Sequence, residues 1–228
     1  MSTSFAKRPR QAAPPVRRHR AAHGHSRHEA SYLRAKRVLD VAICLAILPI
    51  VGMLILLCAL AIRLESAGPI FFVQQRTGKG GRRFGMWKLR TMVPNAEAIK
   101  SDLAALNELP YPDFKIRNDP RVTRVGRVLR TTSLDELPQI INVLRGDMSL
   151  VGPRPTSFTP ETYRLWHTAR LEVQPGITGL WQISGRGEVD FDERLRLDIA
   201  YIRSRSIRTD LSILLRTVAV VTNGRGAH

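Results

Sequence analysis

The sequence has few cysteines and few acidic residues. Its two cysteines, Cys44 and Cys58, stand fourteen positions apart in one apolar segment, or about 21 Å along a straight helix, so we expect no disulfide between them. No group of Cys and His has the spacing of a zinc site, and any chemistry therefore depends on oxygen and nitrogen side chains. Reduced cysteines fit a cytoplasmic surrounding.

Acidic residues are outnumbered almost two to one by basic residues. The 228 residues include 36 Lys and Arg but only 19 Asp and Glu, which gives a net charge of +17. This excess indicates anionic partners, whether nucleic acid, acidic lipid or phosphorylated substrates. The length suits one globular domain with extra segments, since domains run to about 100–200 residues.

Residues 1–35 have too few apolar residues for a core and are rich in Arg, His, Pro and Ala, so we predict a basic, disordered arm. Ten lysines and arginines but only two acids, Glu29 and Asp40, precede Val41. Four histidines offer a metal site, but Arg-rich tails collect histidines that bind nothing, and we favour this second interpretation. These histidines are His19, His23, His25 and His28.

Charged residues are absent from the 22 positions of Val41–Ile62, and about 20 apolar residues suffice to cross the hydrocarbon core of a bilayer. The segment begins too far along the chain for a cleaved signal peptide. Basic residues flank both ends, which favours the cytoplasm for both. Pro49 lacks a backbone donor and favours a bend. The residues leave two topologies open: a hairpin that returns to the same side, and a kinked spanning helix.

Residues 64–228 contain no second run long enough to span a bilayer, and we predict one globular domain there. A Gly-rich basic turn between two short strands predicts a β-hairpin. Helical spacing of apolar residues predicts several helices, and the last has a broad apolar face that suits either the core or a membrane surface. The predicted strands are Pro69–Gln75 and Phe84–Arg90, and the predicted helices are Asn95–Leu106, Thr123–Arg130, Pro160–Leu171, Phe191–Ser204 and Thr209–Val221.

Asp135 and Glu136 open a periodic apolar run that stops at Gly146, which predicts a helix. Ser133 followed by Glu136 matches a capping box, in which the carboxylate only bonds a backbone amide, and the residues alone favour this interpretation. In the alternative, the helix start holds a phosphate, Asp135 attacks phosphorus and Glu136 binds magnesium. Five arginines surround the pair, namely Arg124, Arg127, Arg130, Arg145 and Arg154.

Proline and glycine shape two further basic segments. Arg154 lies between Pro153 and Pro155, so its backbone is stiff and extended. Residues 179–187 (GLWQISGRG) place Gln182 and Arg186 among glycines. That arrangement suits a loop that binds a base, a ribose or a phosphate, and it equally suits an ordinary strand and turn.

Motifs spread over residues 36–222 resemble the bacterial sugar transferases, also called monotopic phosphoglycosyl transferases or polyprenyl-phosphate hexose-1-phosphate transferases. The similarity is carried by KRVLDV at 36–41, KLRTM at 88–92, DPRVTRVGRVLRTTSLDELPQ at 119–139, NVLRGDMSLVGPRP at 142–155 and PGITGLWQISGR at 175–186. It implies transfer of a hexose 1-phosphate from a UDP-sugar to undecaprenyl or another polyprenyl phosphate, with release of UMP. Such a step initiates exopolysaccharide or other glycan synthesis.

The resemblance also implies roles for single residues. Asp135 becomes the nucleophile that forms a covalent aspartyl-phosphosugar intermediate, and Glu136 helps to hold Mg²⁺. Lys88, Arg90, Arg130 and Arg154 are implied to face phosphates, and Gln182 and Arg186 lie in the loop implied in nucleotide-sugar recognition. The loop letters WQISGR are more similar to members that transfer glucose or galactose phosphate than to those that handle acetamido sugars.

The implied fold class is α+β. A re-entrant membrane helix-hairpin broken at Pro49 (residues 36–63) follows the arm (1–35) and precedes a mostly helical cytoplasmic catalytic domain (64–228), with a small β-hairpin and membrane-surface amphipathic helices. Larger relatives carry four spanning helices upstream, so the chain resembles the minimal form, placed on the cytoplasmic face of the inner membrane. The implied partners are UDP-sugar, polyprenyl phosphate and membrane lipid, without nucleic acid, and a homodimer is compatible with the sequence.

Two other functions explain part of the sequence. A membrane-tethered protein that binds nucleic acid or acidic lipid accounts for the charge, but not for the stiff Arg154 segment beside an acidic pair, and no nucleic-acid-binding motif is present. A phosphohydrolase would use the same Asp135 with water as the acceptor. A soluble hydrolase, however, has no need of the apolar segment.

Overall fold

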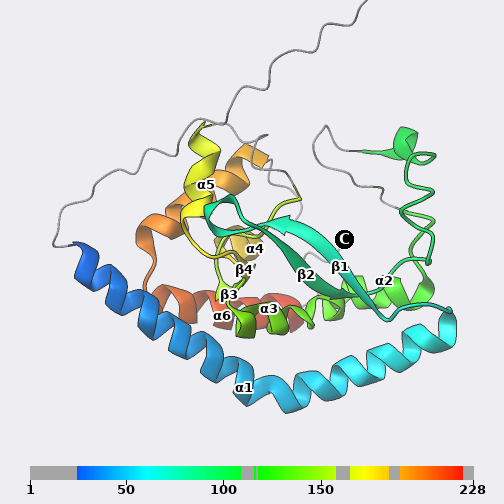
Figure 1. Ribbon diagram of the computed structural model, residues 1–228, viewed down its shortest axis with the longest axis horizontal. Helices are drawn as coiled ribbons and strands as arrows, with labels where there is room; N and C mark the ends of the chain where they lie inside the picture. Colours follow the sequence, from blue (N-terminus) through cyan, green and yellow to red (C-terminus); the bar gives the residue numbers. More distant parts are fainter. Residues whose placement is uncertain (1–24, 109–115, 117, 158–164, 185–190, 223–228) are drawn as a thin grey trace, which may run out of the picture.

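The computed structural model describes residues 25–108, 116, 118–157, 165–184 and 191–222. These residues form a mixed α and β structure in which one long helix lies along one side of a compact body (Figure 1). The α-helices are α1 (His25–Glu65), α2 (Arg124–Thr131), α3 (Gln139–Arg145), α4 (Leu180–Ser184), α5 (Phe191–Ser204) and α6 (Ile207–Thr222). The strands are β1 (Phe71–Thr77), β2 (Arg83–Leu89), β3 (Ser149–Val151) and β4 (Gly176–Thr178), and the 3-10 helices are η1 (Lys79–Gly81), η2 (Ala104–Leu106), η3 (Leu134–Glu136) and η5 (Leu165–Glu172).

Helix α1 contains the apolar segment and starts at His25, so residues 25–35 are helical although we predict a disordered arm for 1–35. The helix is continuous through Pro49, and Figure 1 shows that it bends near its middle. Its two halves, the N-terminal and C-terminal arms of α1, therefore both rise toward the same body. Within the described residues, His28–Glu65 is the one helix long and apolar enough to cross a membrane. A proline within a helix lacks a backbone donor and favours such a bend.

One face of α1 packs on the body and the opposite face is bare. Cys44, Val51, Cys58 and Ile62 are buried, and their spacing of four and seven residues puts them on one side of a helix. Large apolar side chains cover the exposed side, and these are Val38, Leu45, Ile47, Leu48, Ile50, Met53, Leu56, Leu57, Leu60 and Leu64. An exposed apolar surface of this extent marks a lipid or protein contact.

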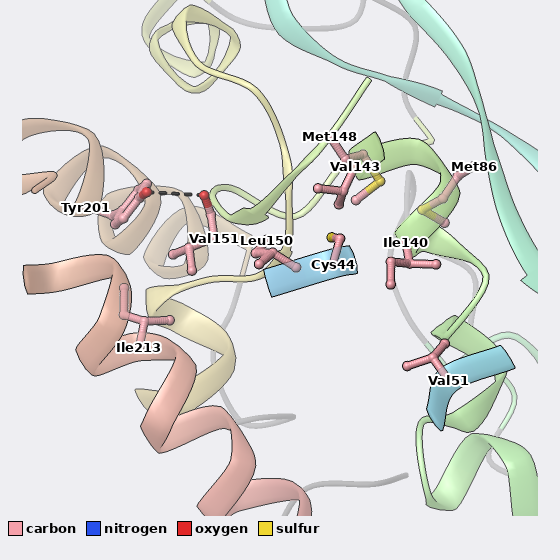
Figure 2. Packing of buried hydrophobic residues seen from close by; sticks show 10 residues of the cluster. All are labelled: Cys44, Val51, Met86, Ile140, Val143, Met148, Leu150, Val151, Tyr201 and Ile213. Atoms are coloured by element: carbon pink, nitrogen blue, oxygen red, sulfur yellow. Dashed lines mark hydrogen bonds between the residues drawn. The ribbon is translucent and has the colours of Figure 1, made fainter. Parts of the chain in front are cut away.

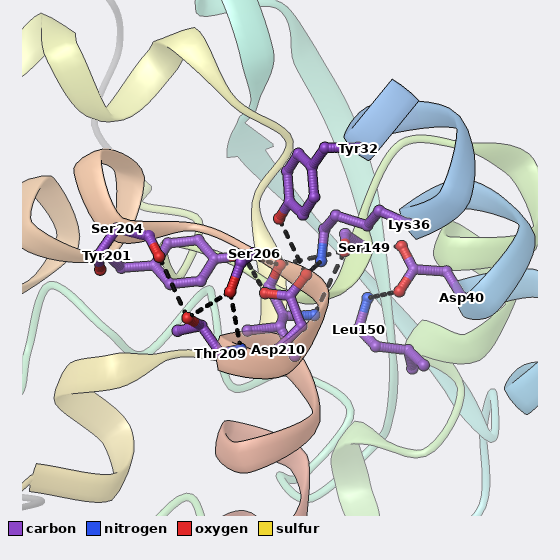
Figure 3. A network of polar contacts seen from close by, with 11 residues as sticks. Tyr32, Lys36, Asp40, Ser149, Leu150, Tyr201, Ser204, Ser206, Thr209 and Asp210 are labelled. Atoms are coloured by element: carbon purple, nitrogen blue, oxygen red, sulfur yellow. Dashed lines mark hydrogen bonds and ion pairs between the residues drawn. The ribbon is translucent and has the colours of Figure 1, made fainter. Parts of the chain in front are cut away.

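The N-terminal arm of α1 is bonded to α6 through a buried carboxylate. Asp210 is 1% exposed and accepts hydrogen bonds from Tyr32 (2.9 Å) and Lys36 (2.8 Å) of α1 and from Tyr201 of α5 (2.7 Å). Figure 3 shows these side chains converging from three helices. Because a buried carboxylate is stable only when its oxygens are paired, this cluster fixes the arm against the body.

The same arm of α1 also contacts α3 and β3. Asp40 accepts a hydrogen bond from the Ser149 hydroxyl at 2.8 Å and a longer one from the Leu150 amide at 3.4 Å (Figure 3). Arg37 donates to carbonyl oxygens in the last turn of α3, where unpaired carbonyls and the helix dipole favour a cation. The arm is therefore bonded to the strand that leads into the Arg154 segment.

The C-terminal end of α1 is bonded to the body as well. Glu65 accepts hydrogen bonds from the amides of Arg124 (2.8 Å) and Val125 (3.1 Å) at the start of α2, where free donors favour an acid. The buried Arg90 guanidinium donates to both carbonyl oxygens of Ser66 and Ala67 at 2.8 Å. Both ends of α1 are thus attached to one folded body.

The predicted β-hairpin is confirmed. Strands β1 and β2 pair antiparallel, with Phe72 opposite Lys88 and Val73 opposite Trp87. Gly80, at φ 66°, allows the tight turn between them. Because directly opposed residues share one face of a hairpin, Phe72 and Lys88 point the same way.

The core lies where α1, α3, α5, α6 and strands β2 and β3 meet. Figure 2 shows its side chains arriving from all of these elements, and the Tyr201 hydroxyl, which donates to Asp210, also lies 3.2 Å from the Val151 carbonyl oxygen. Its buried members are Cys44, Val51, Met86, Ile140, Val143, Met148, Leu150, Val151, Tyr201 and Ile213. The apolar side chains that sequence periodicity places on α6 therefore divide between this core, through Ile213, and the surface, through Leu211, Leu215 and Val218.

Several predicted elements differ from the structure. Helix α5 has the predicted bounds, and α2 and α6 lie within two residues of theirs. The predicted helix at Asn95–Leu106 is wrong, because that segment forms turns followed by the short η2. The prediction for Pro160–Leu171 lies partly outside the described residues, and its described part is 3-10 helix. The parallel pair of β3 and β4 is unexpected, since three residues per strand are too few to show a period of two.

We expect Gly126→Ala to destabilise the fold. A Cβ at this position would lie 2.0 Å from the Thr91 carbonyl oxygen, because α2 crosses the chain there at backbone contact. The overlap should lower the free energy of unfolding by about 2 kcal/mol, despite the gain of about 1 kcal/mol in helix propensity. Thermal unfolding of the purified protein in detergent measures the change. The matched control is Gly52→Ala, where nothing lies within 4 Å, and equal melting temperatures for the two variants would contradict the prediction.

Candidate functional site

The acidic pair lies in a short turn between two helices. Helix α2 begins after Thr123, whose hydroxyl accepts a hydrogen bond from the Gly126 amide at 2.9 Å, and it ends just before Ser133. Ser133 is in the left-handed region at φ 58°, an uncommon conformation for a non-glycine residue that reverses the chain direction. The 3-10 helix η3 then carries Asp135 and Glu136.

The capping-box interpretation of this segment is wrong. Ser133 makes no side-chain cap hydrogen bond, and the Glu136 carboxylate bonds two cationic side chains instead of a backbone amide. The predicted helix start is also wrong, because α3 begins only at Gln139, after Pro138. Its predicted end at Gly146 is confirmed, where the glycine at φ 87° donates to two carbonyls of the last turn.

Glu136 is bound by two cations from distant parts of the chain. Lys88 of β2 donates to one carboxylate oxygen at 2.9 Å, and Arg154 bonds both oxygens, one of them at 3.0 Å. Arg154 therefore uses the planar fork that suits a carboxylate or a phosphate. Burial opposes the charge of Glu136, but Arg154 and Lys88 outweigh it and hold the pKa of Glu136 well below its usual range. The carboxylate is ionised at any physiological pH.

Asp135 has a different environment from its neighbour. Asp135 is 7% exposed, and the Lys88 ammonium lies 3.4 Å from its carboxylate. Burial raises the pKa of Asp135 above its ordinary value; Lys88 and Arg154 oppose the rise, and the Glu136 charge adds to it. Two adjacent carboxylates thus differ in basicity. Active sites use such a difference to give two carboxylates different catalytic roles.

The Arg154 segment is held by backbone hydrogen bonds on both sides. The Pro153 carbonyl accepts from the Gly176 amide at 2.9 Å, and the Thr156 carbonyl accepts from the Thr77 amide at 3.0 Å. The Arg154 carbonyl accepts from the Arg170 guanidinium at 2.6 Å. Arg170 is absent from the residues that the sequence singles out, because no motif or spacing connects it with position 154.

The other predicted phosphate-facing arginines have different positions. Arg90 is 7% exposed, and its guanidinium is directed at the Ser66 and Ala67 carbonyls, so it holds the end of α1. Arg130 lies at the end of α2, the helix that precedes the acidic pair, and donates to the Thr91 hydroxyl at 2.9 Å. The structure therefore brings Lys88 and Arg154 to the acidic pair and gives Arg90 a structural contact.

The predicted nucleotide-recognition loop is described only in part. Gln182 is on α4, is 5% exposed and donates to the Ile177 carbonyl at 3.1 Å, so this contact stabilises the turn from β4 into α4. Arg186 lies outside the described residues, and its predicted role stays a prediction. Residues Leu180–Ser184 (LWQIS) form a short helix after β4, not the strand and turn that the sequence also allows.

The donor set of the site fits magnesium when a diphosphate is also present. No group of three or more His, Cys, Asp or Glu with metal-binding geometry occurs among the described residues. Mg²⁺, however, is usually bound by one or two carboxylates together with substrate phosphates and water, and Asp135 and Glu136 supply two. Lys88 and Arg154 form ion pairs with the Glu136 carboxylate. Phosphate oxygens of the substrate would have to replace Glu136 as the partner of these cations before the carboxylate could bind a metal ion.

The chain is similar to known proteins over most of its length. The model of the family described as bacterial sugar transferase matches residues 31–224. The galactosyl transferase CpsE of Streptococcus agalactiae is 46% identical over 202 residues, which are 88% of this chain and 45% of the relative. The UDP-glucose:undecaprenyl-phosphate glucose-1-phosphate transferase of Caulobacter vibrioides is 46% identical over 192 residues, 80% of this chain and 68% of the relative.

A relative of similar length is matched almost throughout. The exopolysaccharide production protein ExoY of Sinorhizobium fredii is 38% identical over 201 residues, which are 85% of this chain and 88% of the relative. The chain spans less than half of the Streptococcus relative. Each match includes the region of α2, η3 and α3, since every alignment covers at least four fifths of the chain.

Proposed function

The chain belongs to the bacterial sugar transferase family, and from this premise we propose that it transfers a hexose 1-phosphate from a UDP-sugar to undecaprenyl phosphate or another polyprenyl phosphate. The observation that carries the proposal is the buried Asp135, with a raised pKa, beside Glu136, Lys88 and Arg154. Relatives named as undecaprenyl-phosphate galactose and glucose phosphotransferases support it. The same relatives favour glucose or galactose as the sugar, as the WQISGR letters do.

Asp135 is the proposed nucleophile. One of its carboxylate oxygens attacks the phosphorus that carries the sugar, the bond from that phosphorus to UMP breaks, and UMP leaves with the electron pair. An oxygen of polyprenyl phosphate then attacks the same phosphorus and displaces Asp135, which regenerates the carboxylate. Covalent catalysis of this kind divides one difficult displacement into two easier ones, and the raised pKa makes Asp135 a more basic attacking group than an exposed aspartate.

Lys88 and Arg154 have the proposed role of binding phosphate oxygens. Both now neutralise Glu136, and a diphosphate would offer them similar oxygen acceptors with more charge. Glu136, once released, would help to hold Mg²⁺. A bound magnesium ion would neutralise charge on the diphosphate and on the leaving UMP. Positioned charges of this kind are the main means of catalysis in phosphoryl transfer.

Helix α1 is proposed to enter the membrane and return to the same side. Its N-terminal arm is bonded to α6, α3 and β3, and its C-terminal end is bonded to α2 and Arg90. A straight spanning helix of about 20 residues separates its ends by about 30 Å of hydrocarbon, so the two ends could not both reach one body. Basic residues on both flanks favour the cytoplasmic face for that body.

Cysteine labelling tests this topology. In a background with Cys44→Ala and Cys58→Ala, single cysteines are placed at the exposed Ala35 and Ala67. Both should react with a membrane-impermeant maleimide in inverted inner-membrane vesicles, and neither should react in intact spheroplasts. Reaction of the two positions from opposite sides would instead indicate a spanning helix.

The transfer reaction is tested by UMP release. Purified protein in nanodiscs receives Mg²⁺ and a panel of UDP-sugars, with and without undecaprenyl phosphate. We expect stoichiometric UMP without lipid, from one round of covalent modification, and repeated turnover only with lipid. Repeated turnover without lipid would indicate a hydrolase that uses water, and no UMP from any UDP-sugar would contradict the proposed function.

A further inference from the structure

The position of the Arg154 guanidinium depends on how the Arg154 backbone is held. Pro153 and Pro155 lack backbone donors, and the carbonyl of Arg154 is bonded by a side chain, not by a neighbouring strand. That side chain is Arg170, which donates to the carbonyl at 2.6 Å. The guanidinium of Arg154 extends from the same residue to Glu136. Any shift of this backbone would therefore move the guanidinium within the site.

Arg170 itself forms an ion pair with a buried carboxylate. Its Nη2 lies 2.7 Å from a carboxylate oxygen of Asp198. Arg170 is 7% exposed and Asp198 is 1% exposed, on the buried face of α5 between Leu195 and Tyr201. The chain of contacts therefore runs from Asp198 of α5 through Arg170 of η5 to the backbone of Arg154, and from the Arg154 side chain to Glu136.

A buried ion pair of this kind is poorly explained by stability alone. Removing two charges from water is expensive, and well-packed apolar residues often serve the fold equally well. Burial raises the pKa of Asp198 to about 6, although Arg170 and Arg194 favour its charged form, so the carboxylate is less favourable here than in water. What the pair does supply is a guanidinium in a fixed orientation that bonds the backbone of an active-site residue.

Granted the transfer reaction proposed above, on which this inference rests, we propose that Asp198 and Arg170 are positioning residues that fix the Arg154 guanidinium toward Glu136 and the substrate phosphates. Neither touches the reacting atoms. Their effect follows from geometry, because displacement of a charged group by about 1 Å can lower a rate about 100-fold.

The test compares Asp198→Asn with a matched change at another buried ion pair. Asp119 is 9% exposed and pairs with Arg121 at 2.6 Å, and neither has a place in the proposed mechanism. Full-length variants are assayed in nanodiscs at pH 8, where Asp198 is charged, and below their melting temperatures. We expect Asp198→Asn to lower kcat about tenfold or more with less than a threefold change in KM, and Asp119→Asn to change kcat less than twofold.

A double-mutant cycle separates positioning from general destabilisation. If Asp198 acts through Arg154, then adding Asp198→Asn to Arg154→Met should lower kcat by less than twofold further, because the affected group is already absent. If Asp198→Asn fails to fold, Arg170→Lys takes its place in the same cycle, since lysine keeps the charge but not the planar fork. For Arg170→Lys we expect a loss of about three- to tenfold.

The outcomes are distinct. Equal rates for Asp198→Asn and Asp119→Asn, or full additivity with Arg154→Met, would overturn the positioning role while leaving the transfer reaction intact. A wild-type protein without UMP formation in the presence of lipid would overturn both. Non-additive loss at Asp198 and Arg170, with normal kcat in the control, supports the positioning role.

Discussion

Asp135→Asn is expected to abolish transfer without destabilising the protein. Asparagine has the shape of aspartate but cannot form the phosphoryl bond, so UMP release should fall at least about 1000-fold, as expected for loss of a covalent nucleophile. The remaining carboxylate of Glu136 cannot replace it, because Arg154 and Lys88 bind its oxygens and keep it weakly basic. The measurement is UMP formation with lipid, in single and multiple turnover.

The stability of this variant follows from the burial of the residue. Burial raises the pKa of Asp135, so the folded protein binds the proton more tightly than the unfolded chain does. The ionised form therefore opposes folding increasingly as the pH rises above the ordinary aspartate value of about 3.9. Asn removes this charge, and the melting temperature at pH 8 should equal or exceed that of the wild type.

The pH dependence provides an independent check. The difference in melting temperature between Asp135→Asn and wild type should shrink as the pH falls from 8 toward the ordinary aspartate value of about 3.9, because the folded wild-type carboxylate takes up its proton at a higher pH than the unfolded chain does. A variant that is clearly less stable than wild type at pH 8 would show that the ionised Asp135 supports the fold. UMP formation at the wild-type rate would show that the nucleophile is another residue.

Glu136→Gln is expected to produce the second largest effect, with the opposite change in stability. The amide cannot neutralise Lys88 and Arg154, which both bond the carboxylate, and lost hydrogen bonds to charged groups lower the free energy of unfolding by about 2 kcal/mol. Transfer should fall by about 100-fold at saturating magnesium, since one charged ligand and the orientation of two cations are lost together.

Magnesium titration separates the two carboxylates. If Glu136 holds the ion, the concentration of Mg²⁺ for half-maximal UMP release should rise about tenfold or more in Glu136→Gln. Glu97→Gln is the matched control, because Glu97 is exposed and pairs only loosely with Lys100 at 3.5 Å, and its magnesium requirement should match wild type. An unchanged requirement in Glu136→Gln would assign the metal contact elsewhere.

Helices and strands that are long, or whose ends carry characteristic charged or turn residues, were predictable from the sequence. Short strands and segments without packing partners were not. Phe191–Ser204 has Asp192 and Glu193 in its first turn and Arg203 in its last, so its ends are marked. The three-residue strands β3 and β4 have no period to detect. Asn95–Leu106 has helical spacing, but its backbone hydrogen bonds mostly join residues three apart and form turns in place of an α-helix, since spacing alone does not supply packing partners.

The candidate site shows the same division. The residues around Asp135 favoured a capping box, and only the family resemblance favoured catalysis. The structure removed the capping box, because Ser133 takes a left-handed conformation that no local pattern predicts. Lys88 reaches the acidic pair because β2 pairs with β1 and packs on α3, a long-range arrangement. Asp198 and Arg170 meet across 28 positions, and no local rule connects them.

The two attached ends of α1 have a consequence for how the substrates arrive. When α1 lies in the membrane as proposed, the body cannot swing away from the bilayer. Hydrogen bonds hold the body to α1 at Tyr32 and Lys36 near one end of the helix and at Glu65 at the other. The acidic pair then stays at a constant height above the lipid. The lipid acceptor finds it by diffusion within a plane, whereas the nucleotide sugar arrives from the whole volume of the solution. Acceptor encounter thus depends on the surface density of the lipid, not on its bulk concentration.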